Sequence, residues 1–195
     1  MNVKQKISGF ILAGGRSSRM GFEKGMVRIQ KQYMIERVLA ALSQVAGSMS
    51  IISNTNTYSF LKIPLYKDII PGCGPVGGIY TALEVSQTER NLIISCDIPF
   101  VKPGLLQYII DRSRGDDEII LPSEGGLIHP LCGIYRKSIA GNIEHLMANK
   151  VYKMMDIIGY FRYRVLPIDK SMEFYSPDLL KNINSLKDLE EVLIS

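Results

Sequence analysis

A glycine-rich stretch that also carries several cations lies near the N-terminus and is the segment best suited to chemistry. The segment LAGGRSSRMGFEKG, residues 12–25, directly follows an apolar run that begins at Ile7. Its two adjacent glycines, Gly14 and Gly15, let main-chain N–H groups approach a ligand closely. Three cations follow in the same segment: Arg16, Arg19 and Lys24. Bare N–H groups together with cations indicate a loop that binds a polyphosphate.

This loop does not have the spacing of two common nucleotide-binding motifs. No Gly-Lys-Ser/Thr closes it, so it is not a P-loop, and its glycines do not form G-x-G-x-x-G. A tight strand-to-loop turn without a ligand is the structural alternative. The three cations favour polyphosphate binding over that alternative.

Strand-like and helix-like segments alternate along the chain, and they must position this loop. Apolar or β-branched runs predict strands at 7–13, 48–53, 63–66, 92–96, 118–121, 131–135 and 162–166. Helical periodicity predicts helices at 34–45, 78–86, 102–114, 138–149, 152–158 and 185–193, with Ser138 and Ser185 as N-caps. Such alternation predicts a mostly parallel α/β sheet.

Polar side chains follow three of the predicted strands. Asn54, Asp68 and Asp97 each come directly after an apolar run. In open α/β sheets, ligands bind outside the carboxyl ends of the strands. If the sheet is parallel, these side chains and the glycine-rich loop converge on one crevice.

Asp97 is the carboxylate best suited to hold a cation. Mg²⁺ prefers one or two carboxylates together with phosphate oxygens of a substrate. The alternative is an Asx-turn that merely ends a strand. Asn54 and Asp68 suit hydrogen bonds to a nucleobase or a ribose, although both residue types also occupy turns for structural reasons.

Three further features are open to two interpretations each. The segment PGCGPVGGI, residues 71–79, is either a preformed loop near the ligand or a flexible connection. His129 either lines the crevice or is structural, whereas His145 is expected on the surface. The basic residues at 150, 153, 162 and 164 form either a solvated face or a dock for a second anionic substrate.

Bulk composition excludes several classes of protein. The 195 residues are 46% hydrophobic and 22% charged, which is typical of one globular domain, here residues 1–195. A net charge of +4 suits a phosphorylated small molecule and falls short of a nucleic-acid footprint. Three widely spaced cysteines without C-x-x-C predict free thiols. With neither a signal-peptide pattern nor an apolar membrane span, we expect a cytoplasmic protein.

Five sequence blocks occur in an order that resembles a known family. They are LAGGRSSRMGFEKG, PGCGPVGGI, CDIPF, HPLCGIYRK and NINSLKDL, at residues 12–25, 71–79, 96–100, 129–137 and 182–189. The set is similar to the molybdenum cofactor guanylyltransferase family of nucleotidyltransferases. One departure is Glu23, where the family often has Asp. Residues 141–173 match loosely.

The resemblance implies a Rossmann-like three-layer α/β/α sandwich with a mostly parallel sheet. It also implies which residues contact GTP: Leu12, Ala13, Gly14, Gly15, Lys24, Asn54, Asp68 and Asp97. Asp97 would also hold Mg²⁺. Asn182 and Asn184 match a block near the pterin.

The implied reaction is transfer of GMP from GTP to molybdopterin with release of pyrophosphate. The terminal phosphate of molybdopterin would attack the α-phosphorus in line, so no nucleophilic side chain is required. Arg19 and Lys24 would stabilise the departing pyrophosphate, and Mg²⁺ on Asp97 would offset the developing charge.

Other activities remain open at this point. A molybdopterin cytidylyltransferase or a sugar-phosphate nucleotidyltransferase would use a different nucleotide, and a GTP-binding carrier of the cofactor would have no activity. We expect a monomer that binds neither nucleic acid nor membranes. Other molybdenum cofactor biosynthesis proteins and apo-molybdoenzymes are its expected protein partners.

Overall fold

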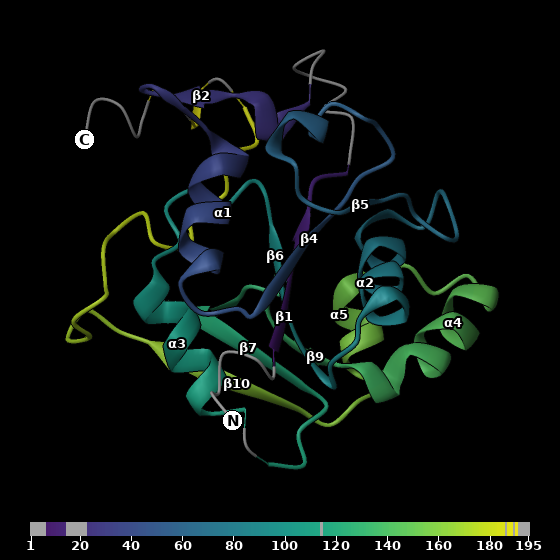
Figure 1. The fold of residues 1–195 in the computed structure, drawn as a ribbon. Helices are drawn as coiled ribbons and strands as arrows, with labels where there is room; N and C mark the ends of the chain where they lie inside the picture. Colours follow the sequence, from purple (N-terminus) through teal and green to yellow (C-terminus); the bar gives the residue numbers. More distant parts are fainter. Residues whose placement is uncertain (1–6, 15–22, 114, 186, 189, 191–195) are drawn as a thin grey trace.

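The computed structural model describes residues 7–14, 23–113, 115–185, 187–188 and 190. Within them, an eight-stranded sheet has the order β10-β7-β9-β6-β1-β4-β5, with β8 paired to β7 (Figure 1). The strands are β1 (Ile7–Leu12), β4 (Ser48–Ile52), β5 (Leu65–Tyr66), β6 (Arg90–Ser95), β7 (Ile119–Glu124), β8 (Leu127–Ile128), β9 (Cys132–Arg136) and β10 (Tyr163–Ile168).

Most of the strand pairs are parallel. β1 pairs in parallel with β4 and β6, β5 with β4, and β10 with β7, whereas β9 runs antiparallel between β6 and β7. The prediction of a mostly parallel sheet is confirmed, and β9 makes the sheet mixed. Because β9 is antiparallel to both of its neighbours, β6 and β7 run in the same direction. The carboxyl ends of β6 and β7 therefore lie at the same edge of the sheet.

Helices cover both faces of the sheet, so the predicted three-layer sandwich is confirmed. They are α1 (Met34–Ser43), α2 (Gly74–Val85), α3 (Pro103–Asp111), α4 (Ala140–Ala148) and α5 (Met154–Ile158). Figure 1 shows α1 and α3 on one face and α2, α4 and α5 on the other. The buried hydrophobic residues divide into two large clusters, one under each helical layer.

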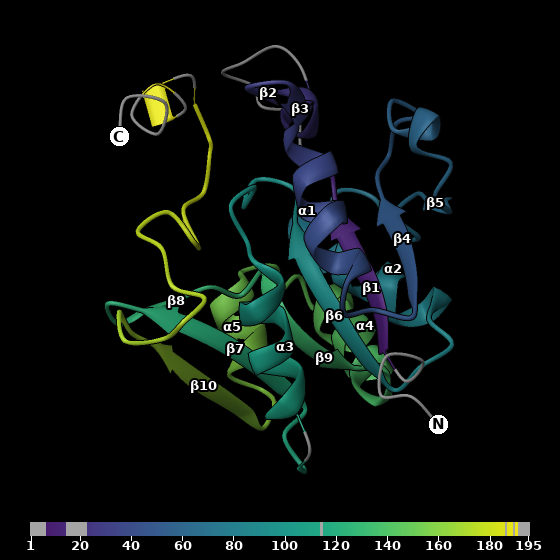
Figure 2. The same cartoon turned by 60° about the vertical axis from the view of Figure 1, so that its left-hand side comes forward.

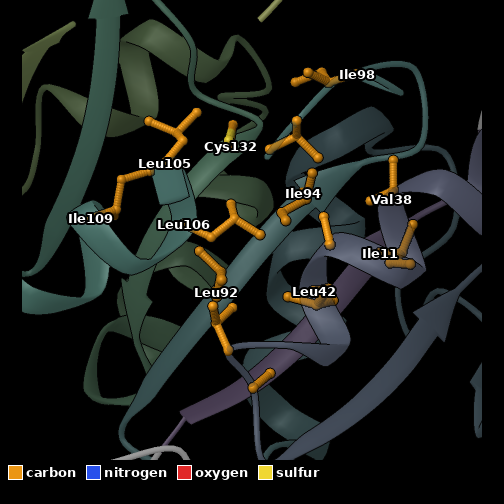
Figure 3. Packing of buried hydrophobic residues seen from close by; sticks show 14 of the residues in the cluster. Ile11, Val38, Leu42, Leu92, Ile94, Ile98, Leu105, Leu106, Ile109 and Cys132 are labelled. Carbon is orange, nitrogen blue, oxygen red and sulfur yellow. The ribbon is translucent and has the colours of Figure 1, made fainter. Parts of the chain in front are cut away.

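Strand β1 shows how a central strand of this sheet is buried on both faces. Ile7 and Ile11 belong to the cluster beneath α1 and α3, and Phe10 and Leu12 belong to the cluster beneath α2. Alternate side chains of a strand point to opposite faces, so a sheet covered on both faces buries every position. Figure 3 shows α1 and α3 residues such as Leu42 packed on the first of these faces.

Two predicted helix starts were wrong. Helix α2 begins at Gly74 rather than at residue 78, because Pro75 occupies the first turn, where a missing N–H costs nothing. Ser138 does not cap α4: a 3₁₀ turn, Lys137–Ile139, precedes that helix, and the Ser138 hydroxyl donates to Glu89 Oε1 at 2.8 Å.

The N-cap of the last predicted helix was predicted correctly, and one small hairpin was missed. Ser185 N donates to Asp188 Oδ2 at 2.9 Å, and Asp188 N donates to Ser185 Oγ at 3.2 Å, which is the expected capping box. The rest of the predicted 185–193 helix lies partly outside the described residues. The strands β2 (Arg28–Ile29) and β3 (Gln32–Tyr33) form a hairpin that no period-2 pattern predicted.

Among the helices of the described residues, none has the length and apolar character needed to cross a membrane.

Gly133 in β9 marks the tightest approach of two strands. A Cβ built there would lie 2.4 Å from the Ile120 carbonyl oxygen and 2.7 Å from Leu121 Cδ2. We predict that Gly133→Ala lowers the free energy of unfolding by about 1–3 kcal/mol, because strand backbones cannot retreat as a side chain can. Urea denaturation followed by circular dichroism measures this change.

Gly141 is the matched control for that substitution. It is exposed in helix α4, and a Cβ there meets nothing within 4 Å. Gly141→Ala is expected to raise the free energy of unfolding by about 0.4–1 kcal/mol. Equal effects of the two substitutions would contradict the packing assigned to β9.

Candidate functional site

One row of residues across the sheet determines the location of the site. Leu12 of β1 pairs with Ile52 of β4 and with Ser95 of β6, and Ile52 pairs in turn with Tyr66 of β5. The predicted site residues stand two positions beyond this row on their four strands: Gly14, Asn54, Asp68 and Asp97. Parallel strands in register therefore place all four at one edge of the sheet, the edge toward which the arrows of β1, β4 and β6 point in Figure 2.

These residues line a cleft of about 620 Å³ at the carboxyl edge of the sheet. Its lining includes six residues named in the sequence analysis: Leu12, Gly14, Lys24, Asn54, Asp68 and Asp97. It also includes Glu23, Ser95, Leu131 and glycines of the 71–79 segment. The prediction that the strand ends converge on one crevice is confirmed.

Lys24 lies between two polar groups from distant parts of the chain. Its Nζ donates to Asn184 Oδ1 at 2.6 Å and lies 3.6 Å from Asp97 Oδ2. The side chains of Lys24 and Asp97 are 25% and 16% exposed, so both reach the cleft surface while remaining largely shielded. Ile183 N donates to the Asp97 carbonyl oxygen at 2.8 Å, which brings the C-terminal segment next to Asp97.

A buried tyrosine supports the backbone on either side of Lys24. Tyr58, 1% exposed, donates its hydroxyl to Glu23 Oε2 at 3.3 Å. A Cβ on Gly25 would lie 2.8 Å from the same hydroxyl oxygen, so only glycine allows this approach. Burial raises the pKa of the Tyr58 phenol well above its usual value, and Cys96 and Glu23 raise it further. The phenol therefore stays protonated and remains a donor to Glu23.

Asn54 and Asp68 hold each other through two hydrogen bonds. Asn54 Nδ2 donates to Asp68 Oδ2 at 2.8 Å, and the Asp68 backbone N–H donates to Asn54 Oδ1 at 3.0 Å. An amide paired in this reciprocal way fixes the orientation of the carboxylate at the cleft. Both residues therefore do more than terminate a strand.

The 71–79 segment turns sharply into helix α2. Gly72 and Gly74 have φ values of +84° and +59°, which residues with a side chain rarely adopt. These left-handed positions turn the chain sharply into α2, whose first residues, Gly74 and Pro75, line the cleft. The N-terminus of α2 thus faces the space between Asp68 and Leu12.

The predicted site residues up to Asp97 fall into three groups. Six line the cleft, as described above. Ala13 is 2% exposed, and its N–H donates to the Ile52 carbonyl oxygen at 2.9 Å, so it lies at the site without a side chain directed to a ligand. Gly15, Arg16 and Arg19 lie outside the described residues.

The two asparagines of the C-terminal block differ in position. Both are exposed, and Asn184 accepts a hydrogen bond from Lys24. The Asp97 carboxylate faces Lys24, and in the described part of the chain no hydrogen bond closes an Asx-turn on it. Its role as a magnesium ligand stays a prediction. Tyr58 was not anticipated, because a lone aromatic residue after a strand carries no sequence signal.

The described residues do not form a complete metal site by themselves. No group of three or more His, Cys, Asp or Glu side chains in the described ranges could hold an ion. A single carboxylate, Asp97, at the cleft surface fits a magnesium ion whose remaining ligands are phosphate oxygens and water. The donor chemistry therefore fits a metal that arrives with a nucleotide.

The histidines and the C-terminal basic cluster lie apart from this chemistry. His145 is exposed, as predicted, and His129 is 8% exposed. Burial lowers the pKa of His129, so it is neutral at pH 7. Arg162 lies 3.6 Å from Glu118, and Arg164 pairs with Asp117, so these two cations of the cluster have acidic partners.

Cys96, adjacent to Asp97, is not a nucleophile. It is 4% exposed, and burial, followed by the negative charge of Asp97, raises the pKa of its thiol to about 12. The reactive form of cysteine is the thiolate, which is negligible at pH 7 for such a pKa. A covalent intermediate on this residue is therefore excluded.

An α/β sandwich with such a cleft at its strand ends has the architecture of a nucleotide-binding protein. A family model described as the MobA-like NTP transferase domain matches residues 9–163. A protein of Flavobacterium johnsoniae, named as a probable molybdenum cofactor guanylyltransferase, is 37% identical over 191 residues, covering 98% of each chain. A protein of the same name from Carboxydothermus hydrogenoformans is 33% identical, covering 97% and 96%. The chain belongs to the MobA-like NTP transferase family, and its class is nucleotidyltransferase.

Solved structures share the fold. Molybdopterin-guanine dinucleotide biosynthesis protein A from Archaeoglobus fulgidus superposes with a TM-score of 0.80 at 22% identity, covering 94% of this chain and 95% of that one. A nucleotidyl transferase from Methanothermobacter superposes with a TM-score of 0.73 at 17% identity, covering 95% of each chain. The cleft thus lies in an architecture common to nucleotidyl transferases.

The buried thiols give a prediction that depends on pH. Burial raises the pKa of Cys96 and of Cys132 to about 12, against 9.0 when exposed. The unfolded chain therefore loses protons between pH 9 and 12 that the folded chain retains, and the free energy of unfolding falls as the pH rises through this range.

In native protein at pH 8, iodoacetamide should leave Cys96 and Cys132 unmodified, and in denaturant it should label them. Peptide mass spectrometry reads the result, and rapid native labelling of Cys96 would contradict its burial.

Proposed function

We propose that this chain transfers GMP from GTP to molybdopterin, forming the guanine dinucleotide form of the molybdenum cofactor and pyrophosphate. The observation that carries the proposal is the cleft in which Gly14, Lys24 and Asp97 meet. Membership of the nucleotidyltransferase family, and the names of relatives that align over nearly their whole length, support the same activity.

The base of GTP is assigned to the β4–β5 side of the cleft. Asp68 there offers a carboxylate whose orientation Asn54 fixes. A guanine presents two adjacent donors, N1–H and the 2-amino group, and a carboxylate accepts two such hydrogen bonds side by side. Adenine lacks the N1–H and cytosine lacks this donor pair, so this geometry favours guanine.

The triphosphate is assigned to the β1–β6 side. Gly14 leaves the backbone after β1 uncovered, and a Cβ there meets nothing within 4 Å. Lys24 supplies a cation that can exchange Asn184 for phosphate oxygens. Arg19, which lies outside the described residues, remains a predicted second cation for the pyrophosphate.

The reaction needs positioning and charge neutralisation rather than a nucleophilic side chain. A phosphate oxygen of the acceptor forms a bond to the α-phosphorus, and the bond from that phosphorus to the β-phosphate oxygen breaks. Both electrons of that bond leave with pyrophosphate, whose charge Lys24 offsets. Asp97 would hold a divalent cation, for which we propose Mg²⁺; when bound, this ion would supply positive charge that offsets the charge developing on the reacting phosphates. The Lys24 Nζ lies 3.6 Å from Asp97 Oδ2 and so helps to direct this carboxylate at the cleft.

The proposed activity is accompanied by expectations for the location, oligomeric state and partners of the protein. We propose a cytoplasmic monomer that meets other molybdenum cofactor biosynthesis proteins and apo-molybdoenzymes. Neither nucleic acid nor a membrane has a role in the proposed reaction.

The direct test is pyrophosphate release from GTP, CTP, ATP and UTP, with Mg²⁺ and with molybdopterin added or omitted. We expect release from GTP only, and only with molybdopterin present. Release from CTP would retain the enzyme class and change the product. GTP binding without release in any mixture would favour a carrier and overturn the proposal.

Substitution of Asp97 should lower the turnover number more than it lowers the affinity for the nucleotide. We predict that Asp97→Asn lowers kcat by about 10²–10³-fold, because charge stabilisation at the reacting phosphates is lost, while the Kd for GTP changes by less than about tenfold. Steady-state kinetics and calorimetric titration measure the two quantities. Asp111→Asn is the control, because Asp111 is an exposed carboxylate at the end of α3. Unchanged turnover in Asp97→Asn would remove Asp97 from the mechanism.

A further inference from the structure

Thr81, a buried residue of helix α2, has contacts that the proposed function does not use. Its side chain is fully buried, at 0% exposure. The hydroxyl donates to the Gly77 carbonyl oxygen at 2.8 Å, as threonine commonly does within a helix. The Thr81 hydroxyl oxygen also accepts a hydrogen bond from the backbone N–H of Ile69 at 3.0 Å. One hydroxyl thus links α2 to the residue that follows Asp68.

Two glycines allow this segment to lie directly on the helix. A Cβ on Gly77 would lie 3.0 Å from the Ile70 carbonyl oxygen and 4.0 Å from Asp68 Cγ. A Cβ on Gly78 would lie 3.8 Å from Asp68 Oδ1 and 3.2 Å from Leu12 Cδ2. The carboxylate of Asp68 therefore rests on a bare turn of α2, in contact with the cleft.

Asp68 is consequently held from two sides. Asn54 binds its Oδ2 and its backbone N–H from the β4 side. Thr81 binds the next backbone N–H, that of Ile69, from the helix side. Ile69 itself is 51% exposed, so its own side chain contributes little to fixing this segment. The hydrogen bond from Ile69 to Thr81 is the polar tie between the segment and α2.

We infer that Thr81 is a positioning residue for base selection, which rests on the proposed function of Asp68. By fixing the Ile69 backbone, it sets the position of the Asp68 carboxylate against N1–H and the 2-amino group of guanine. Displacement of a recognition group by about 1 Å is enough to lose much of an oriented interaction. Loss of the Thr81 hydroxyl should therefore weaken discrimination by the base and leave the phosphate end of the cleft unaffected.

The test compares binding of GTP and inosine triphosphate, which lacks the 2-amino group. Three variants are measured by calorimetric titration with Mg²⁺: Thr81→Ser, Thr81→Ala and Thr81→Val. Serine and alanine both remove the methyl group, so they differ only in the hydroxyl. Valine keeps the volume and removes the hydroxyl. Thermal unfolding of each variant establishes that it is folded, and the serine and alanine pair suffices if valine does not fold.

We expect the parent protein to bind GTP about 10–100-fold more tightly than inosine triphosphate, because the carboxylate loses one charge-assisted hydrogen bond. Alanine and valine should lower this ratio about tenfold, and serine should retain it. Equal ratios in the serine and alanine variants, or a loss of affinity shared by both nucleotides, would reduce Thr81 to a structural role and overturn the inference. A parent that binds the two nucleotides equally would instead refute the base assignment of Asp68, and the inference with it.

Discussion

The site depends on the in-register parallel pairing of four strands. The paired row runs across β5, β4, β1 and β6 through Tyr66, Ile52, Leu12 and Ser95. After this row the polypeptide leaves the sheet at each of the four strands. Because strand side chains alternate between faces, a slip of one residue would move a strand's buried set to the wrong layer. The hydrophobic cores on both faces therefore fix the register, and the register fixes where the polar groups emerge.

The polar groups of the cleft are held mainly by partners from elsewhere in the chain. Lys24 contacts Asn184, Asp68 pairs with Asn54, and Tyr58 supports Glu23. Of these groups the Tyr58 hydroxyl is buried, so its bond to Glu23 satisfies a polar group that would otherwise be desolvated without compensation. The ion pair of Lys24 and Asp97 leaves both charges available, because each is still partly exposed. The arrangement is rigid at its base and exchangeable at its surface.

The sequence was sufficient to predict the fold class and most of the cleft. Apolar runs followed by Asn54, Asp68 or Asp97 are local patterns, and parallel topology brings their ends together without further information. The family resemblance places Asn184 in a block near the pterin, and neither that resemblance nor the residue spacing indicates its contact with Lys24. Tyr58 and Thr81 were not predicted as site residues, because their importance arises from tertiary contacts.

Errors in the predicted elements have similar causes. Ser138 has the residue type of an N-cap, yet its hydroxyl bonds Glu89 from another segment, so a tertiary partner replaced the local one. Helix α2 starts early because two left-handed glycines redirect the chain before Pro75. Strand β9 reverses direction within the sheet, and no local pattern distinguishes a buried parallel strand from a buried antiparallel one.

The bond between Lys24 and Asn184 has a consequence for the synthesis of the protein. These residues are 160 positions apart, and Ile183 binds the backbone of Asp97 from the same C-terminal segment. Chains emerge from the ribosome N-terminus first, so β1, β4 and β6 can pair long before residue 184 becomes available. A nascent chain would therefore hold Lys24 beside Asp97 without its third partner until residue 184 has been synthesised. The cleft reaches its final form only after the sheet beneath it has been able to form.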